Sequence, residues 1–210
     1  LKLVMLLEPS ENGLVRHEVR AECGVNSHIH IMTIMIGRGD IYSDDHVTLS
    51  GDGARFDADA AYLGKNSQTI DYNIVADHFG KKTESLITVN GALTDSAKKV
   101  FRGTIDFKKG SADSVGSENE TVLMLGDDVV NKTVPLILCA EENVEGTHGA
   151  TIGELDADTM FYFESRGIDR ETAEKIMAYA AVERLIHMAE DSEFAAVAEK
   201  AMGIKTDTEE

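Results

Sequence analysis

The stretch Pro135–Ile168, PLILCAEENVEGTHGATIGELDADTMFYFESRGI, contains the change of pattern that decides the fold. A short apolar run leads to Cys139, an acidic segment follows, and the sequence THGAT occupies residues 147–151. After Gly153 the spacing of apolar residues becomes helical. The chain therefore changes here from a strand-rich part to a helical end, and His148 lies at the junction.

Short apolar or alternating runs fill the chain before this junction, and most are bounded by Gly, Asp, Asn or Ser. Many are rich in Val, Ile and Thr, which is typical of β-strands. Helical periodicity is nearly absent before residue 154, so we expect an all-β body that is a sandwich, a jelly roll or a β-helix. Asn90-Gly91 is expected to form a hairpin turn in an antiparallel fold or a corner in a β-helix. The clearer predicted strands are Leu14–Val19, Ser27–Ile36, His46–Leu49, Ser67–Val75, Ser85–Val89, Val100–Phe107, Thr121–Leu125 and Val134–Ala140.

Three helices are predicted after the junction, each preceded by an aspartate that can cap its first turn. Asp156 begins a helix that ends near Gly167, and Asp169 begins the second. Asp191 begins the third, which ends at Gly203. Helical spacing on the second helix predicts one apolar face of Ala173, Ile176, Met177 and Ala180, with Tyr179, Val182 and Ile186 in a row beside it.

Composition limits the partners and the compartment. The chain of 210 residues carries a formal net charge of −18, so nucleic acids and anionic membranes are poor partners. Two cysteines are too few for a disulfide framework, which favours a reducing, cytoplasmic location. No apolar run reaches the roughly 20 residues of a membrane span. The absence of Trp and the 6% content of aromatic residues disfavour a carbohydrate-active β-helix, since few side chains can stack on sugars.

Two histidine groups are candidates for metal chemistry. His28 and His30 share one face of a predicted strand, a spacing that suits a metal site and keeps open a jelly-roll-type metalloenzyme. Cys139 lies nine residues before His148, with Glu141, Glu142 and Glu145 between them. Thiolate, imidazole and carboxylate together could bind iron or zinc. The alternatives are two half-exposed strand histidines, a small buried cysteine and a hydrogen-bonded turn histidine.

Two further segments have weaker signals. Gly51-Asp52-Gly53-Ala54 resembles part of a phosphate loop, but no GK[ST] follows, so we interpret it as a turn. Asp57 and Asp59 share a strand face, which fits an exposed polar face as well as a cation site.

The signature GTHGATIGELD at 146–156, followed by FYFESRGI at 161–168, closely resembles the C-terminal part of the SufB/SufD family of iron–sulfur cluster assembly scaffolds. NGAL at 90–93, VFRGTI at 100–105 and LSGDGA at 49–54 resemble earlier parts of that family in the expected order. The resemblance covers roughly residues 14 to 185.

This resemblance implies a fold and a non-enzymatic function. The fold is mainly β: a right-handed parallel β-helix over residues 1–153, a small C-terminal α-helical domain over 154–203 and a flexible tail over 204–210. The implied function is that of a scaffold subunit that acts with the SufC ATPase and pairs with a second SufB/SufD-type subunit as a homodimer or heterodimer. A transient iron–sulfur cluster or iron is expected, with no tightly bound cofactor. The predicted metal residues are His148 and Cys139, and the predicted partner-binding residues are Phe161, Phe163, Arg166 and Ile168.

The departures from the family pattern indicate a SufD-like member. SufB-type members carry a cysteine at the position that corresponds to Val129, and SufD-type members can carry one at the position of Gly146. The histidine itself is present as His148, so an imidazole replaces thiolates as the expected ligand, with Cys139 as a possible substitute.

Overall fold

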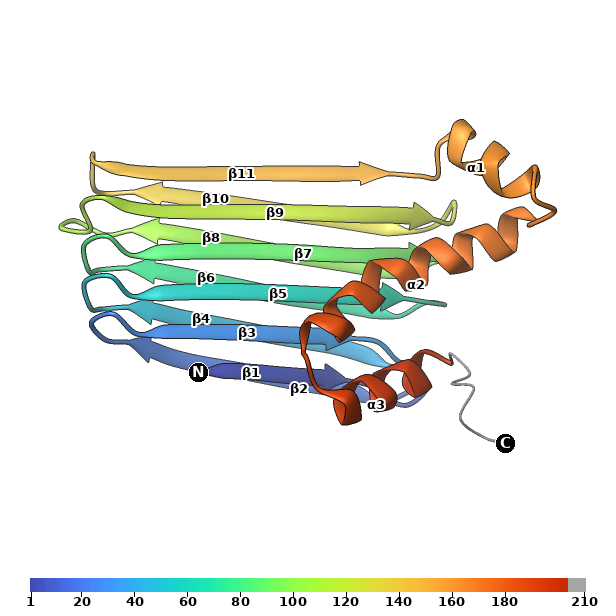
Figure 1. Ribbon diagram of the computed structural model, residues 1–210, viewed down its shortest axis with the longest axis horizontal. Helices are drawn as coiled ribbons and strands as arrows, with labels where there is room; N and C mark the ends of the chain where they lie inside the picture. Colours follow the sequence, from blue (N-terminus) through green and yellow to red (C-terminus); the bar gives the residue numbers. More distant parts are fainter. Residues whose placement is uncertain (204–210) are drawn as a thin grey trace.

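The computed structural model describes residues 1–203, which form two parallel β-sheets and three helices (Figure 1). The front sheet of Figure 1 has the order β1-β3-β5-β7-β9-β11 and the back sheet the order β10-β8-β6-β4-β2. The strands are β1 Lys2–Leu7, β2 Leu14–Cys23, β3 His28–Met35, β4 Asp40–Leu49, β5 Arg55–Gly64, β6 Thr69–His78, β7 Glu84–Thr94, β8 Lys98–Phe107, β9 Ser114–Leu125, β10 Val130–Cys139 and β11 Val144–Gly153.

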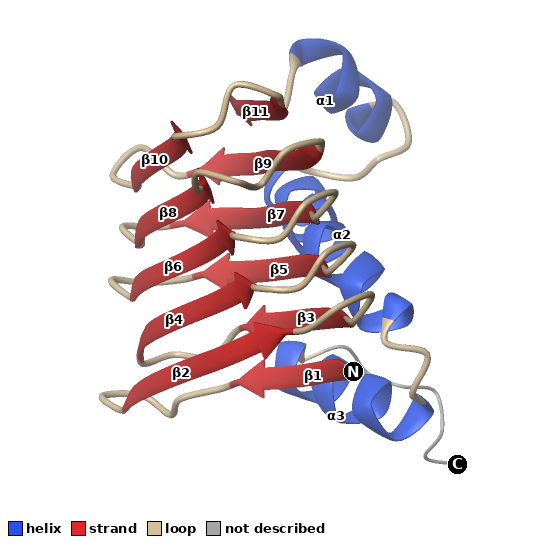
Figure 2. Cartoon of the chain, turned by 90° about the vertical axis from the view of Figure 1, so that its left-hand side faces the viewer, coloured by secondary structure: helices blue, strands red, loops and turns tan. Residues whose placement is uncertain are grey.

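The chain winds as a parallel β-helix in which successive strands alternate between the two sheets. In Figure 1 it runs rightward in the front sheet and leftward in the back sheet while it rises, which is a right-handed winding. Figure 2 shows the turns stacked as successive layers. Every strand pair is parallel, so the β-helix is confirmed and the sandwich and jelly roll are excluded.

The stacked turns have similar lengths, although the sequence shows no exact repeat. The front-sheet strands β3 to β11 begin at residues 28, 55, 84, 114 and 144, which is a period of 27 to 30 residues. Corners are held by residues with positive φ, such as Asn26 at 53° and Asn66 at 54°, a conformation that asparagine tolerates well. The backbone N–H of Asn66 donates to Asp95 Oδ2 of the next turn at 2.7 Å. This corner is therefore bonded to the corner above it.

The predicted strands all lie within observed ones or overlap them, but several segments were missed. Residues 2–7 and 144–153 form β1 and β11 and were not assigned as strands, and β5 at 55–64 was indicated only by the shared strand face of Asp57 and Asp59. The prediction for Asn90-Gly91 was wrong, because both residues lie inside β7 rather than at a hairpin turn or a corner. A Cβ on Gly91 would lie 2.4 Å from the Tyr62 ring of β5. The glycine thus makes room for a buried aromatic ring. The expected turn at 51–53 is confirmed.

The space between the sheets is a continuous apolar core with a few polar groups in it. Inward-facing side chains include Phe56, Tyr72 and Phe101, all buried. Asp45 of β4 is also buried, and its Oδ1 has no hydrogen-bond partner. Burial, with a smaller contribution from the Asp44 carboxylate, raises the pKa of Asp45 to about 7. A carboxyl group inside the core therefore titrates near neutrality.

The helices are α1 Ala157–Glu164, α2 Arg170–Met188 and α3 Ser192–Met202. Their caps are as predicted: the side chains of Asp156, Asp169 and Asp191 accept backbone N–H groups of the first turns, and Gly203 ends α3 with φ of 80°. α2 packs on the outer face of the front sheet, against β3, β5 and β7. Among residues 1–203 no helix has the length and apolar character needed to span a bilayer. The predicted tail, 204–210, lies outside the described residues.

The predicted apolar face of α2 was only partly right. Ile176 and Ala180 are exposed, whereas Val182 and Ile186 of the neighbouring row are buried. The side chains of α2 that are buried form one broad band centred on the second row. The buried positions of α2 are Ala173, Ala178, Val182, Leu185 and Ile186.

Gly91→Ala is expected to lower the free energy of unfolding by about 1–3 kcal/mol, because the new methyl group overlaps the Tyr62 ring. Urea denaturation measures this. Gly24→Ala is the control: a Cβ at Gly24 meets no atom within 4 Å, so a change of less than about 0.5 kcal/mol is expected. Equal effects of the two substitutions would contradict this account of Gly91.

Asp45→Asn is expected to remove a pH dependence of stability. The pKa of Asp45 is raised in the folded state, so its contribution is complete below the unfolded value and is lost as pH rises through about 7. The wild-type chain should lose about 1.4 kcal/mol per pH unit from this group between its two pKa values. Urea titrations at pH 5 and pH 8 should show the variant gaining stability relative to wild type at pH 8. A constant difference at both pH values would refute it.

Candidate functional site

His148 lies in the middle of β11, the last strand of the front sheet, and not in a turn as expected. Side chains alternate along a strand, so His148 shares a face with Gly146. A Cβ on Gly146 would lie 2.7 Å from Ile137 Cγ2 of β10, which shows that this face points between the sheets. Within residues 1–203 no strand stacks above β11, and His148 is therefore inward-facing yet exposed. The imidazole lies at the open end of the β-helix.

Glu118 of β9 is the in-register neighbour of His148, one turn below it. Its side chain is 2% exposed and points across the interior at Gly103 of β8, where a Cβ would lie 2.1 Å from Glu118 Oε2. That oxygen has no hydrogen-bond partner. Burial, with a smaller contribution from the Glu120 carboxylate, raises the pKa of Glu118 to about 7. A carboxyl group without a cationic partner thus lies beneath His148.

A buried ion pair lies beside Glu118. The Lys99 ammonium of β8, with no exposed surface, donates to Glu120 and to Thr133 Oγ1, and Thr133 in turn donates to Glu120 Oε2 at 2.5 Å. Burial lowers the pKa of Lys99, and the Glu120 carboxylate opposes that shift. Lys99 is thereby committed to Glu120 rather than to Glu118.

Two buried phenols complete this polar region of the core. The hydroxyl groups of Tyr62 and Tyr72 lack hydrogen-bond partners. Burial raises the pKa of both phenols, with the Glu120 carboxylate adding to the effect. Polar groups therefore occur in the interior from β5 to β10, and the β-helix is open above β11 within the described residues.

Cys139 ends β10 and is exposed, so it is not the small buried hydrophobe considered as an alternative. It leaves β10 at the end where β11 begins, and His148 lies four residues into β11, about 13 Å along the strand. Across residues 1–203 no group of three or more His, Cys, Asp and Glu side chains could hold a metal ion. The chain thus does not bring Cys139 together with His148, and a metal role for either residue stays a prediction.

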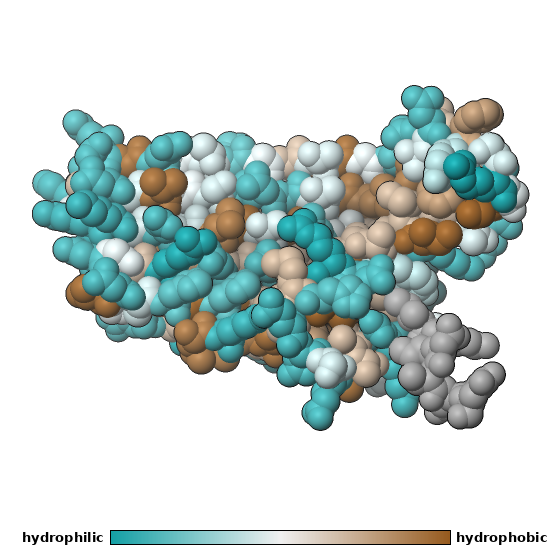
Figure 3. Space-filling model, in the orientation of Figure 1, coloured by the Kyte–Doolittle hydropathy of each residue, from teal (hydrophilic) through white to brown (hydrophobic). Residues whose placement is uncertain are grey.

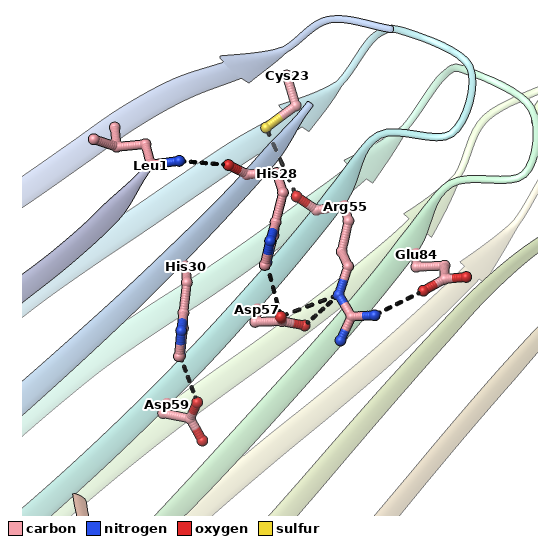
Figure 4. Close-up of polar contacts among 8 residues, drawn as sticks. All are labelled: Leu1, Cys23, His28, His30, Arg55, Asp57, Asp59 and Glu84. Carbon is pink, nitrogen blue, oxygen red and sulfur yellow. Dashed lines mark hydrogen bonds and ion pairs between the residues drawn. The ribbon is translucent and has the colours of Figure 1, made fainter. Parts of the chain in front are cut away.

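His28 and His30 lie on the outer face of β3, as predicted, but each contacts its own aspartate on β5 (Figure 4). His28 Nε2 is 2.8 Å from Asp57 Oδ2, and His30 Nε2 is 2.7 Å from Asp59 Oδ2. Arg55 also donates to Asp57. The two imidazoles stack at 6.5 Å without converging on one point. This face therefore consists of separate cross-strand pairs and does not favour the metalloenzyme alternative.

The predicted partner-binding residues lie in and after α1. Phe161 is 72% exposed, whereas Phe163 and Ile168 are half-buried and joined by a backbone hydrogen bond of 3.1 Å. The Arg166 guanidinium lies 3.6 Å from the centre of the Tyr162 ring. Tyr162, which is part of the same FYF sequence, is also exposed. Figure 3 shows apolar surface gathered around α1 and the start of α2.

Comparisons with known proteins agree with this geometry. The family model described as SUF system FeS cluster assembly, SufBD core domain, matches residues 1–181. The iron–sulfur cluster assembly protein SufD of Bacillus subtilis is 31% identical over 156 residues, which cover 74% of this chain and 36% of that protein. A SufBD family protein of Synechocystis is 25% identical over 182 residues, 87% of this chain and 38% of that protein. SufD of Escherichia coli is 30% identical over 88 residues, 42% of this chain and 21% of that protein.

The chain thus spans well under half the length of these relatives, and the family match covers most of the chain. The resemblance of the GTHGATIGELD and FYFESRGI segments is confirmed, including its SufD-like character. The parallel β-helix, the histidine on its last strand and the match over residues 1–181 lead to one conclusion: this chain belongs to the SufBD core family of the SUF iron–sulfur cluster assembly system.

Proposed function

We propose that this chain is a SufD-like scaffold subunit in iron–sulfur cluster assembly and is not itself an enzyme. The observation that carries the proposal is the exposed, inward-facing His148 at the open end of a SufBD-type β-helix. A neutral imidazole binds iron. His148 holds iron or a transient cluster as cargo, and the chain retains no resident cofactor. Cys139, exposed on the same turn, is a second candidate ligand toward another subunit.

The open end also supports pairing with a second SufB/SufD-type subunit. β10 and β11 are edge strands of the two sheets and present unpaired N–H and C=O groups. Leu136 and Leu138 of β10 are exposed at 44% and 46% on the outer face of this turn. Unpaired backbone together with exposed leucines is the surface that β-augmentation by a partner strand covers. His148 then lies at the interface between the two subunits.

The helical end supports contact with a SufC-type ATPase. α1 extends beyond the last turn and, among the described elements, packs mainly on α2 (Figure 1). Phe161 and Tyr162 are exposed on it, which leaves aromatic surface for a partner. The nucleotide chemistry comes from that partner, and this chain transmits the motion through α1 and α2. The net charge of −18 and the free thiols suit a cytoplasmic protein without nucleic-acid partners.

His148→Ala should impair cluster assembly in a reconstituted complex while it leaves the fold and ATPase docking unchanged, because an exposed side chain contributes little stability. The measurement is the yield of cluster by visible absorption, with thermal denaturation as the check on folding. Thr147→Ala is the matched control, since Thr147 is the adjacent residue and faces outward to Ser117. Normal yield from folded His148→Ala protein would reject the ligand role. Cys139→Ser should have the smaller effect.

Phe161→Ser combined with Tyr162→Ser should weaken binding of the SufC-type ATPase by tenfold or more, since exposed aromatic residues dominate interface energies. Pull-down and titration calorimetry measure this. Val197→Ser, an exposed apolar position on α3, is the control and should leave the affinity within about twofold. Undiminished affinity of the double variant would place the ATPase contact elsewhere.

A further inference from the structure

We propose that a groove at the C-terminal ends of the front-sheet strands binds an extended, basic segment of a partner protein. The groove follows the right-hand end of the front sheet in Figure 1, between the loops that leave these strands and the helices α2 and α3. Neither His148 nor Phe161 lines it, so the inference is independent of the proposed iron ligand and of the proposed ATPase contact.

Three neighbouring cavities make up this groove. The largest, of about 1040 Å³, lies between the loops after β1, β3 and β5 and the end of α3. The second, of about 390 Å³, lies between the ends of β5, β7 and β9 and the first half of α2. The third, of about 250 Å³, lies beside the end of β9, the segment after β11 and the start of α2. The first two share Leu63 and Lys65, and the last two share Leu125 and Glu174, so the cavities lie end to end.

The length of the groove fits an extended chain segment. From β1 to β11 the front sheet has five strand spacings of about 4.8 Å each, which gives a length of about 24 Å. An extended segment rises about 3.3 Å per residue, so about seven residues span this length. A small molecule would fill one cavity, whereas such a segment contacts all three.

The middle of the groove has an apolar floor. Leu63 of β5 and Ala178 of α2 are buried there, and Leu125 of β9 is half-buried. The half-buried Tyr179 ring extends this floor, with the Lys65 ammonium 5.4 Å from its centre. Successive side chains of an extended segment point to opposite sides, so every second residue of the occupant should be apolar.

The charge of the lining selects a basic occupant. Carboxylates outnumber ammonium and guanidinium groups seven to four among the residues that line the groove. Two of the four cationic groups already have partners in the groove: Lys175 donates to Glu171 at 2.7 Å, and Arg170 donates to Glu174 at 3.4 Å. Interfaces place opposite charges against one another, which favours lysine and arginine in the occupant.

Carboxylates without an ion-pair partner among residues 1–203 lie along the whole groove. Glu8 lies in the first cavity, Asp95 in the second, and Asp127 and Glu154 in the third. Basic residues of a partner would supply counter-charges to these four groups. Residues 204–210, which follow the lining residue Gly203, carry three carboxyl side chains and one lysine, so the same charge argument disfavours them as the occupant.

A labelled heptapeptide that alternates lysine and leucine, with lysine at both ends, tests the groove in the full chain. Fluorescence anisotropy at about 0.15 M salt, which screens charges more than about 8 Å apart, gives the dissociation constant. Asp127→Asn combined with Glu154→Gln should raise this constant tenfold or more. Glu22→Gln combined with Glu145→Gln is the matched control, since these exposed residues lie near the end of β2 and the start of β11, away from the groove. The control removes the same charge and should stay within twofold of wild type.

A second peptide, in which serine replaces each leucine, measures the contribution of the apolar floor and should bind at least tenfold more weakly. No binding of the lysine–leucine peptide would overturn the proposal. Equal weakening in both double variants, or equal affinity of the two peptides, would also overturn it, because binding would then come from the net charge of −18 and not from the groove. Thermal denaturation of each variant confirms that a loss of binding is not a loss of fold. None of these outcomes changes the roles proposed for His148 and Phe161.

Discussion

Backbone hydrogen bonding between successive turns is the constraint on which this molecule depends. Each strand of a parallel β-helix satisfies its N–H and C=O groups only through the strands above and below it. The pairing runs in register from β1 to β11 in the front sheet and from β2 to β10 in the back sheet. The last turn therefore has groups that no described strand of the chain can satisfy. The position of His148 follows from this, because an inward-facing residue is accessible only on a terminal turn.

The in-register pairing also stacks residues that are about 29 positions apart in the sequence. On the outer face, this stacking places acidic side chains beside histidines. On the outer face Asp57 and Asp59 stand beside His28 and His30, and His46 stands 2.7 Å from Asp77. His28 is exposed in these pairs, and the other members are half-buried. In the interior, Glu118 Oε2 has no hydrogen-bond partner, and other buried polar groups occur along the stack from Thr33 of β3 to Glu120 of β9.

Part of this structure could be predicted from the sequence, and the missing part has physical causes. Helix caps were predicted correctly because Asp156, Asp169 and Asp191 act locally, through the first turn of the helix that each begins. β5 was indicated only by the shared strand face of Asp57 and Asp59, and the role of these residues could not be predicted because their histidine partners lie on β3. Asn90-Gly91 has the local signature of a turn, yet close approach of Tyr62 explains the glycine. Glu118 has no signal in its neighbours along the chain, since the residue against which its carboxyl group packs, Gly103, lies on β8.

The helix α2 links turns of the β-helix that do not contact one another directly. A β-helix in which each turn contacts only its neighbours behaves as a one-dimensional array and can fray from its ends. α2 crosses the outer face of three strands, and the Lys2 ammonium of β1 donates to Met188 and Ala189 at its C-terminal end, at 3.0 and 2.9 Å. β1 is thus hydrogen-bonded to the end of α2, a helix that comes after β11 in the chain. Loss of a turn that contains β1, β3, β5 or β7 then disturbs contacts with α2 as well as with the adjacent turns, so these turns should unfold together rather than one by one.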